Sequence, residues 1–381
     1  MTRIFLFPLA VLSFAFDALA VRQEIYPIGE IPIVDTHVHM RGGRSDFDDI
    51  VSMMDQWGGT LAISMDGGGD MNEMDYIQNS LDGRILLTAQ DYSMGDGMWD
   101  VDEITDYANA GYSGFKVFNK YQMPMSEVEG HSENFQRMAE VGLPVMGFHI
   151  GDPPEGSWSV PDKYMIYHKD AEVVMSNHPS TTFIMAHMFW LCCNDTSLDT
   201  LSMFMDRTPN IYLDMAATFH YFNPPQPSYD KLRDFIITYK DRILYGTDGN
   251  AGHSSSQWSN TREMMETDDE GLSGFFGGGG MQGLGLPVDV LNYIYYWNAS
   301  RLIPGVKEAL ENQGYVIGDE PPTEDVTATI GPDGPQHHPQ YLDERQVYTI
   351  QGKKVLIKDK TQGKACKKTN SLPAGKYVET R

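Results

Sequence analysis

Eight short apolar runs recur along the chain, and most of them are followed by a loop and then by a stretch with helical spacing of its apolar residues. Several runs are almost wholly apolar, which is typical of parallel strands buried on both faces. Strand and helix alternating eight times predict an α/β fold, a (β/α)8 TIM barrel. The expected strands are residues 31–39, 59–64, 84–90, 114–118, 143–149, 181–187, 210–216 and 242–248.

The segments between these runs contain helix signals. A helix is expected to start at Ser45, a residue type that favours helix N-caps, and another to stop at Gly111. The alternative fold is an open, doubly wound sheet, which would carry a glycine-rich dinucleotide turn after its first strand. That position holds His37-Val38-His39-Met40 instead, so the barrel is favoured. Further helices are expected over 132–142, 161–179 and 229–241.

The N-terminal segment reads as a targeting signal. Arg3 is followed by a short apolar run that ends in Ala18-Leu19-Ala20, the small-x-small pattern of signal cleavage. A membrane anchor is the alternative, but the run is short and interrupted for a spanning helix. We therefore expect a cleaved signal peptide and an exported protein that is periplasmic, cell-surface or extracellular.

Composition changes twice after the eighth run. Residues 250–286 are polar and glycine-rich, and we expect them to lie over the barrel mouth as a mobile lid or a surface insertion. The C-terminal segment is basic and contains two short strand patterns, 347–350 and 354–357, which suggest a small β appendage. The expected order is a signal peptide over 1–20, a barrel domain over 21–317, a linker over 318–345 and a small β tail over 346–381.

Charge and cysteine content exclude two classes of protein. The chain has 53 acidic and 28 basic residues and a formal charge of −25, so it would repel nucleic acid. It has only three cysteines, which is too few for a disulfide scaffold in an exported protein. Cys192 and Cys193 are expected to be buried as small apolar residues.

Five potential metal ligands fall at the ends of expected strands. His37 and His39 are two residues apart and so face the same side at the end of the first strand. His149, His187 and Asp248 end the fifth, sixth and eighth strands. A (β/α)8 barrel builds its active site at this end, and imidazole and carboxylate suit Zn²⁺ and related ions. Any one of these histidines alone could be a hydrogen-bonded structural residue, but five at one rim indicate a metal site.

Two further residues are candidates for substrate binding. Lys116 lies on the fourth strand, where a buried lysine is costly unless it is paired. It could hold a substrate carboxylate, bridge two metals if carbamylated, or be a packed structural lysine. His220 follows the seventh strand and could line the mouth.

His168 and His178 fall in or after an expected helix, and we expect them at the surface.

At this point the sequence resembles a known family. The motifs "VDTHVH", the histidine after strand five, "AH" after strand six and "YGTD" at strand eight are similar to those of the amidohydrolase superfamily. The similarity is greatest to the amidohydrolase-related branch, which includes aminocarboxymuconate-semialdehyde decarboxylase and several lactonases. The resemblance covers about residues 31–305. The sequence departs from that branch at "AHMFWLCCND", which replaces a small glycine-containing turn.

The resemblance implies roles for the candidate residues. His37, His39, His149 and Asp248 match metal ligands, and Asp248 also matches the group that takes a proton from water. His187 matches a histidine that is a ligand in some members and a polarising or proton-shuttling group in mononuclear ones. Lys116 occupies the strand of a bridging carbamylated lysine that the related branch generally lacks. One divalent ion, Zn²⁺, is therefore the expected cofactor.

These observations predict an exported metal-dependent hydrolase that uses a metal-activated water on a C=O bond of a lactone, ester or amide. The first alternative is a metal-dependent, non-oxidative decarboxylase of a small carboxylic acid, and the second is a non-catalytic surface barrel that binds a ligand. The expected partner is a small-molecule substrate, and homo-oligomerisation stays open. The basic tail resembles C-terminal sorting modules of exported bacterial proteins, which implies contact with a secretion machinery; the alternative is a plain β extension.

Overall fold

A computed structural model describes residues 29–67, 71–90, 99–119, 124–150, 161–219, 228–320 and 322–323, together with three short strands near the C-terminus. The predicted signal peptide, residues 1–20, lies outside the described residues. Among the described residues, none of the helices combines the length and the apolar character that a membrane crossing needs.

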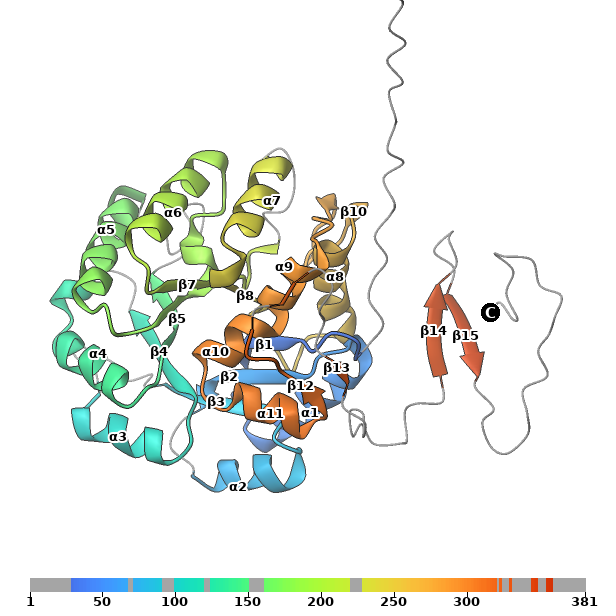
Figure 1. Ribbon diagram of the computed structural model, residues 1–381, viewed down its shortest axis with the longest axis horizontal. Helices are drawn as coiled ribbons and strands as arrows, with labels where there is room; N and C mark the ends of the chain where they lie inside the picture. Colours follow the sequence, from blue (N-terminus) through green and yellow to red (C-terminus); the bar gives the residue numbers. More distant parts are fainter. Residues whose placement is uncertain are drawn as a thin grey trace, which may run out of the picture.

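Parallel strands form one curled sheet in sequence order (Figure 1). They are β1 (Val34–His39), β2 (Leu61–Gly67), β3 (Ile85–Gln90), β4 (Gly114–Asn119), β5 (Val145–Ile150), β6 (Phe183–Met185) and β7 (Ile211–Asp214). Each lies within or beside a predicted apolar run, and β1 to β3 are buried along nearly their whole length. Burial on both faces explains why these runs lack polar alternation.

The eighth strand closes the barrel in two pieces. β8 (Ile243–Leu244) pairs with β7, and β9 (Gly249–Asn250) pairs with β1. Between the two pieces, Thr36 N donates to Tyr245 O and Asp248 N donates to His37 O, at 3.0 and 2.9 Å. The predicted (β/α)8 barrel is confirmed, and an open doubly wound sheet is excluded because both edges of the eighth strand are paired.

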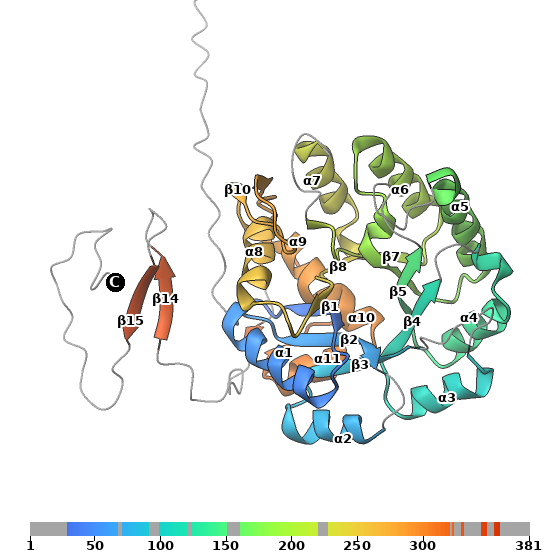
Figure 2. The same ribbon diagram turned by 180° about the vertical axis from the view of Figure 1, so that it is seen from behind.

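Helices lie outside the strands in both views (Figures 1 and 2). Five were predicted: α1 (Arg44–Trp57), α3 (Val101–Asn109), α4 (His131–Glu140), α5 (Pro161–Asn177) and α7 (Tyr229–Thr238). Three were missed: α2 (Met71–Ser80), α6 (Asp195–Arg207) and α8 (Ser255–Glu266).

The signals at helix ends were partly correct. Gly111 adopts a φ of 90° just beyond α3, as a C-terminal stop requires. The Ser45 cap was wrong: α1 already begins at Arg44 after Gly43, and Ser45 Oγ donates to Gly42 O. Gly43 has a φ of 63°, a conformation that glycine adopts without strain, so α1 starts without a side-chain cap.

The segment 250–286 is not a loose insertion, and its role as a lid stays a prediction. It contains α8 and the antiparallel pair β10 (Glu270–Leu272) and β11 (Met281–Gln282). Trp258, Met264 and Phe275 are buried against the barrel. A few large apolar side chains anchor this segment, although glycine and polar residues dominate its composition.

The chain after residue 286 completes the fold with short elements. A helical stretch is formed by α9 (Val288–Asn292), a π-helical turn η5 (Tyr293–Trp297) and α10 (Asn298–Leu302), and α11 (Val306–Asn312) follows it. β12 (Tyr315–Val316) pairs with β13 (Thr329–Ile330), and β14 (Glu344–Tyr348) pairs with β15 (Lys354–Lys358), both antiparallel. The β14–β15 pair confirms the small C-terminal β appendage.

Two expectations about single residues are settled by burial. Cys192 and Cys193 are buried, as predicted. His168 is also fully buried, so its expected surface position was wrong. Its Nε2 donates to Phe189 O at 2.7 Å, which satisfies the ring inside the protein. His178 is partly exposed.

Candidate metal centre

The end of β1 meets the bend of the eighth strand at one carboxylate. His37 is buried and His39 is partly exposed, and their ring centroids lie 5.5 Å apart. Asp248 sits between β8 and β9 with a φ of 63°, an unusual value for a residue with a side chain. Its Oδ1 lies 3.4 Å from His37 Nε2 and 3.1 Å from His39 Nε2. One oxygen therefore faces two imidazoles.

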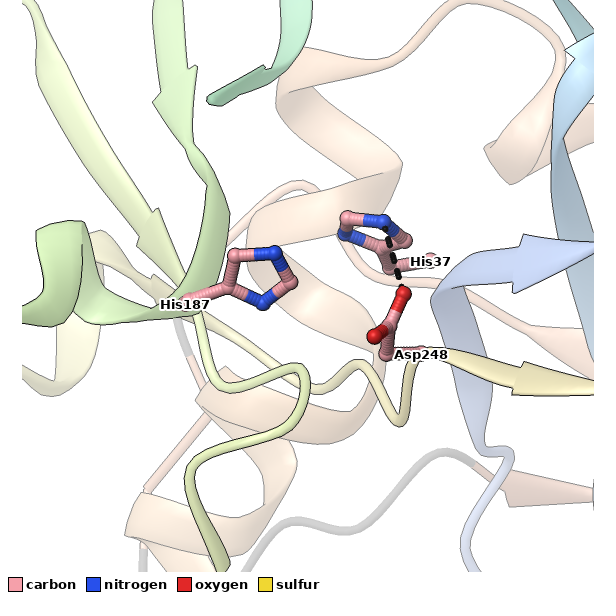
Figure 3. A group of neighbouring side chains, drawn as sticks. All are labelled: His37, His187 and Asp248. Carbon is pink, nitrogen blue, oxygen red and sulfur yellow. Dashed lines mark ion pairs between the residues drawn. The ribbon is translucent and has the colours of Figure 1, made fainter. Parts of the chain in front are cut away.

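His187 joins this group from the turn after β6, a helical turn η2 (Ala186–Trp190). One ligand atom each from His37, His187 and Asp248 lie within 4.8 Å of one another (Figure 3). Figure 3 shows the two imidazoles side by side and the Asp248 carboxylate pointing from the loop of the eighth strand toward His37. The resemblance implies either a ligand role or a catalytic role for His187, and its position suits a ligand.

Three imidazoles share one hydrogen-bonding arrangement, in which Nδ1 faces an acceptor. The pairs are His37 Nδ1 with Asp214 Oδ2 (2.8 Å), His39 Nδ1 with Asp66 Oδ2 (2.7 Å) and His187 Nδ1 with Ala216 O (2.8 Å). A carbonyl oxygen or a carboxylate accepts the Nδ1 proton, so the neutral ring keeps a lone pair on Nε2. Metal-binding histidines are oriented in this way. The donor set of imidazole nitrogens and one carboxylate fits a divalent ion such as Zn²⁺.

The two carboxylates behind the histidines were missed in the sequence. Asp66 lies near the end of β2 and Asp214 ends β7. Both therefore meet the criterion that selected the histidines, a position at the end of a strand. Burial alone would raise the pKa of Asp214, but the contacts with His37 and His187 together outweigh burial and lower it. For Asp66, burial is outweighed by the hydrogen bond from His39 together with the charges of His39, Lys116 and Arg41, and the pKa is lowered. Both therefore carry a negative charge toward the rings.

Charge at Asp248 follows from the same neighbours. Burial would raise the pKa of this carboxyl, but the neighbouring His39, His187 and His37 hold it well below its usual range. Asp248 is therefore a carboxylate at neutral pH.

The remaining predicted residues are placed as follows. His149, in β5, is buried, and its ring lies edge-on to His187 with centroids 4.9 Å apart. Burial holds its pKa well below the usual value, so the ring is neutral. Lys116 is buried in β4, with Nζ 3.1 Å from His37 Nε2. His220 lies outside the described residues. The roles of His37, His39, His149, His187, Asp248 and Lys116 stay predictions.

Asp35 links the histidine strand to the eighth strand and was also missed. Its carboxylate accepts hydrogen bonds from His37 N, Thr247 N, Thr247 Oγ1 and Trp258 Nε1, at 3.2, 3.1, 2.6 and 2.8 Å. Burial raises the pKa of Asp35 to about 7 despite these bonds. Because Thr247 precedes Asp248, this carboxyl holds His37 and Asp248 in register.

We expect Asp35→Asn to lower the free energy of unfolding by about 1–3 kcal/mol. An amide has the same shape, but its NH₂ group would face a donor on Thr247 or Trp258 and leave that donor unpaired. Urea unfolding of the variant, beside Asp75→Asn on the exposed face of α2 as a control, measures the effect. Equal stability of the two variants would contradict the role given to Asp35.

A model of the amidohydrolase family matches residues 100–305, more than half of the chain. This range includes His149, His187 and Asp248. No curated protein matches.

Several solved structures are similar to this chain. One is an uncharacterized TIM-barrel protein from Bordetella bronchiseptica, with 12% identity and a TM-score of 0.48. Two others are 5-carboxyvanillate decarboxylase from Sphingomonas paucimobilis, with 11% identity and a TM-score of 0.46, and an amidohydrolase from Burkholderia multivorans with bound zinc, with 10% identity and a TM-score of 0.44. Each match covers 71% of this chain and 98% of the other chain. With the family model spanning more than half of its length, the chain belongs to the amidohydrolase family.

Proposed function

We propose that this protein is a metal-dependent hydrolase in which water attacks the C=O bond of a lactone, ester or amide. The observation that supports this most strongly is the shared orientation of His37, His39 and His187. Each ring has its Nδ1 proton on an acceptor, and the Nε2 atoms of His37 and His39 lie within 3.4 Å of the same Asp248 oxygen.

His37 and His39 would hold a divalent ion through Nε2, and Asp248 would hold it through its carboxylate. His149 and His187, whose rings neighbour each other, are the candidates to complete the site. When bound, the ion supplies Lewis acidity, which lowers the pKa of a coordinated water towards ~7 and polarises the substrate carbonyl. Zn²⁺ suits this set of nitrogen and oxygen donors.

The protein's own groups would move the protons. Asp248 is a carboxylate at the centre of the group, so it can take a proton from the attacking water and return it to the leaving group. Where His149 completes the metal site, His187 keeps its Nε2 for proton transfer, because its Nδ1 proton is committed to Ala216 O. Once protonated there, it can donate to the developing oxyanion.

Lys116 favours a carboxylate in the substrate, because its ammonium group is buried beside His37. Burial lowers the pKa of Lys116, while the carboxylates of Asp248, Asp66 and Asp214 favour its charged form. A substrate carboxylate is also what a decarboxylase of this family would act on, so metal-dependent decarboxylation is the second candidate function.

Replacing Lys116 by methionine is expected to raise KM for a carboxylate-bearing substrate by about 10–100-fold, since a charged hydrogen bond contributes ~1.5–3 kcal/mol. The turnover number should change much less, because Lys116 would bind the carboxylate and not the reacting bond. Steady-state kinetics measure this, with Lys240→Met, which removes a surface ion pair with Asp289, as the control. An unchanged KM in the Lys116 variant would rule out the carboxylate contact.

Substrate panels separate the candidate functions. The purified protein, loaded with Zn²⁺, is tested on lactones, esters and amides for hydrolysis, and on aromatic and enol acids for release of CO₂. Hydrolysis that depends on the ion supports the first proposal, whereas CO₂ release without hydrolysis supports the second. Tight ligand binding with no turnover of any class would indicate a non-catalytic binding barrel.

Export is part of the proposal. It is supported by the apolar run that ends in Ala18-Leu19-Ala20 and by the resemblance of the basic tail, residues 346–381, to sorting modules.

A further inference from the structure

The turn that carries His187 has an unusual backbone. His187, Met188, Phe189 and Trp190 have φ values of 60°, 47°, 60° and 54°, four consecutive left-handed residues without a glycine. Left-handed backbone brings Cβ too close to the following carbonyl oxygen, so such runs are unfavourable for residues with side chains. All four residues are buried. The turn therefore needs support from its surroundings.

Contacts from three sides provide that support. Asp214 Oδ1 accepts a hydrogen bond from His187 N at 2.9 Å, and His168 Nε2 on α5 donates to Phe189 O at 2.7 Å. Cys193 Sγ donates to Trp190 O at 3.3 Å. Backbone strain that is fixed from several sides in this way is typical of functional sites.

The conformation places an aromatic face on His187. The rings of Trp190 and His187 are stacked, with centroids 4.3 Å apart and an interplanar angle of 24°. The hydrogen bond from Nδ1 to Ala216 O fixes one atom of the imidazole. The indole fixes the plane of the ring, which that single bond leaves free to tilt. Together they hold the His187 ring in the group with His37 and Asp248, in which one ligand atom of each residue lies within 4.8 Å of the others.

We propose that Trp190 is a positioning residue that holds the His187 imidazole in the orientation required at the metal centre. The step from ring orientation to metal affinity rests on the proposed function; the orientation itself does not. A glycine in place of Trp190 has no side chain to stack on the imidazole. The sequence "HMFW" therefore adopts an unfavourable backbone conformation that fixes the orientation of the His187 ring.

The test compares the wild type with Trp190→Leu, which keeps an apolar side chain without a ring, and with Trp190→Phe, which keeps a ring. Trp297→Leu is the matched control, because Trp297 is equally buried but lies on η5. Nitrogen NMR of labelled histidines in the metal-free protein reports the His187 tautomer, with His187→Gln identifying the signal. Titration with Co²⁺, followed by visible absorption, reports metal affinity, and thermal unfolding reports stability.

Trp190→Leu is expected to mix the two His187 tautomers and to weaken Co²⁺ binding about tenfold or more, as losses around a ligand usually do. Trp190→Phe should restore both signals, and Trp297→Leu should lower only stability. A wild-type His187 signal in Trp190→Leu would overturn the proposal, as would wild-type Co²⁺ affinity in that variant. If the wild type itself takes up no Co²⁺, the proposed function fails, and the NMR comparison alone decides the role of Trp190.

Discussion

Replacing His37 by alanine is expected to abolish metal binding and to reduce turnover at least about a thousandfold. The variant loses a ligand nitrogen, and each ~1.4 kcal/mol of lost transition-state stabilisation is a factor of ten in rate. It also leaves the buried Asp214 carboxylate without its 2.8 Å partner, which costs about 3–5 kcal/mol of stability. Metal content by elemental analysis, turnover and thermal unfolding measure the three effects.

His37→Asn separates metal binding from folding. The asparagine amide nitrogen can take the place of Nδ1 and donate to Asp214, but nothing replaces Nε2. This variant should fold with near-normal stability and still bind no metal. His131→Ala, which removes a histidine that donates to Val128 O outside the cluster, should keep both metal and activity. Full activity of metal-free His37→Asn would contradict the proposal that His37 holds a metal ion needed for catalysis.

Replacing Asp248 by asparagine should lower turnover by about 10²–10⁴, the range expected for loss of a general acid–base group. Folding should survive, because asparagine tolerates the left-handed backbone that Asp248 adopts and the side chain is about a quarter exposed. The charge is lost, and with it the proton acceptor and one metal ligand. The measurement is the turnover number at saturating metal, together with its dependence on pH.

Asp82→Asn provides the control for Asp248. Asp82 also has a positive φ, of 52°, but it is exposed between α2 and β3 and is not one of the candidate site residues. It should behave as the wild type. A turnover number for Asp248→Asn equal to that of Asp82→Asn would remove Asp248 from the proposed mechanism.

Much of the barrel could be predicted because buried parallel strands have a direct signature in sequence. β3, for example, begins with three large apolar residues and is buried along its whole length, so no alternation needed to be recognised. The eighth strand was predicted as one run, but it is divided around Asp248, whose left-handed backbone interrupts the pairing. α8 was missed because polar residues and glycines surround its few anchors, such as Trp258.

The site could be predicted in part for a similar reason. His37, His39 and Asp248 lie at strand ends, so topology alone brings them together. Asp66 and Asp214 lie at equivalent positions, but aspartate near a strand end is common and carries no signal without the histidine opposite. The stack of Trp190 on His187 could not be predicted, because it depends on four left-handed residues that local preference disfavours.

The most direct test of the metal centre is anomalous diffraction at the zinc edge from crystals grown with Zn²⁺. One peak is expected, at about 2.0–2.2 Å from His37 Nε2, His39 Nε2 and an Asp248 carboxylate oxygen. Crystals of catalytically active protein with no anomalous peak among these three residues would contradict the central claim.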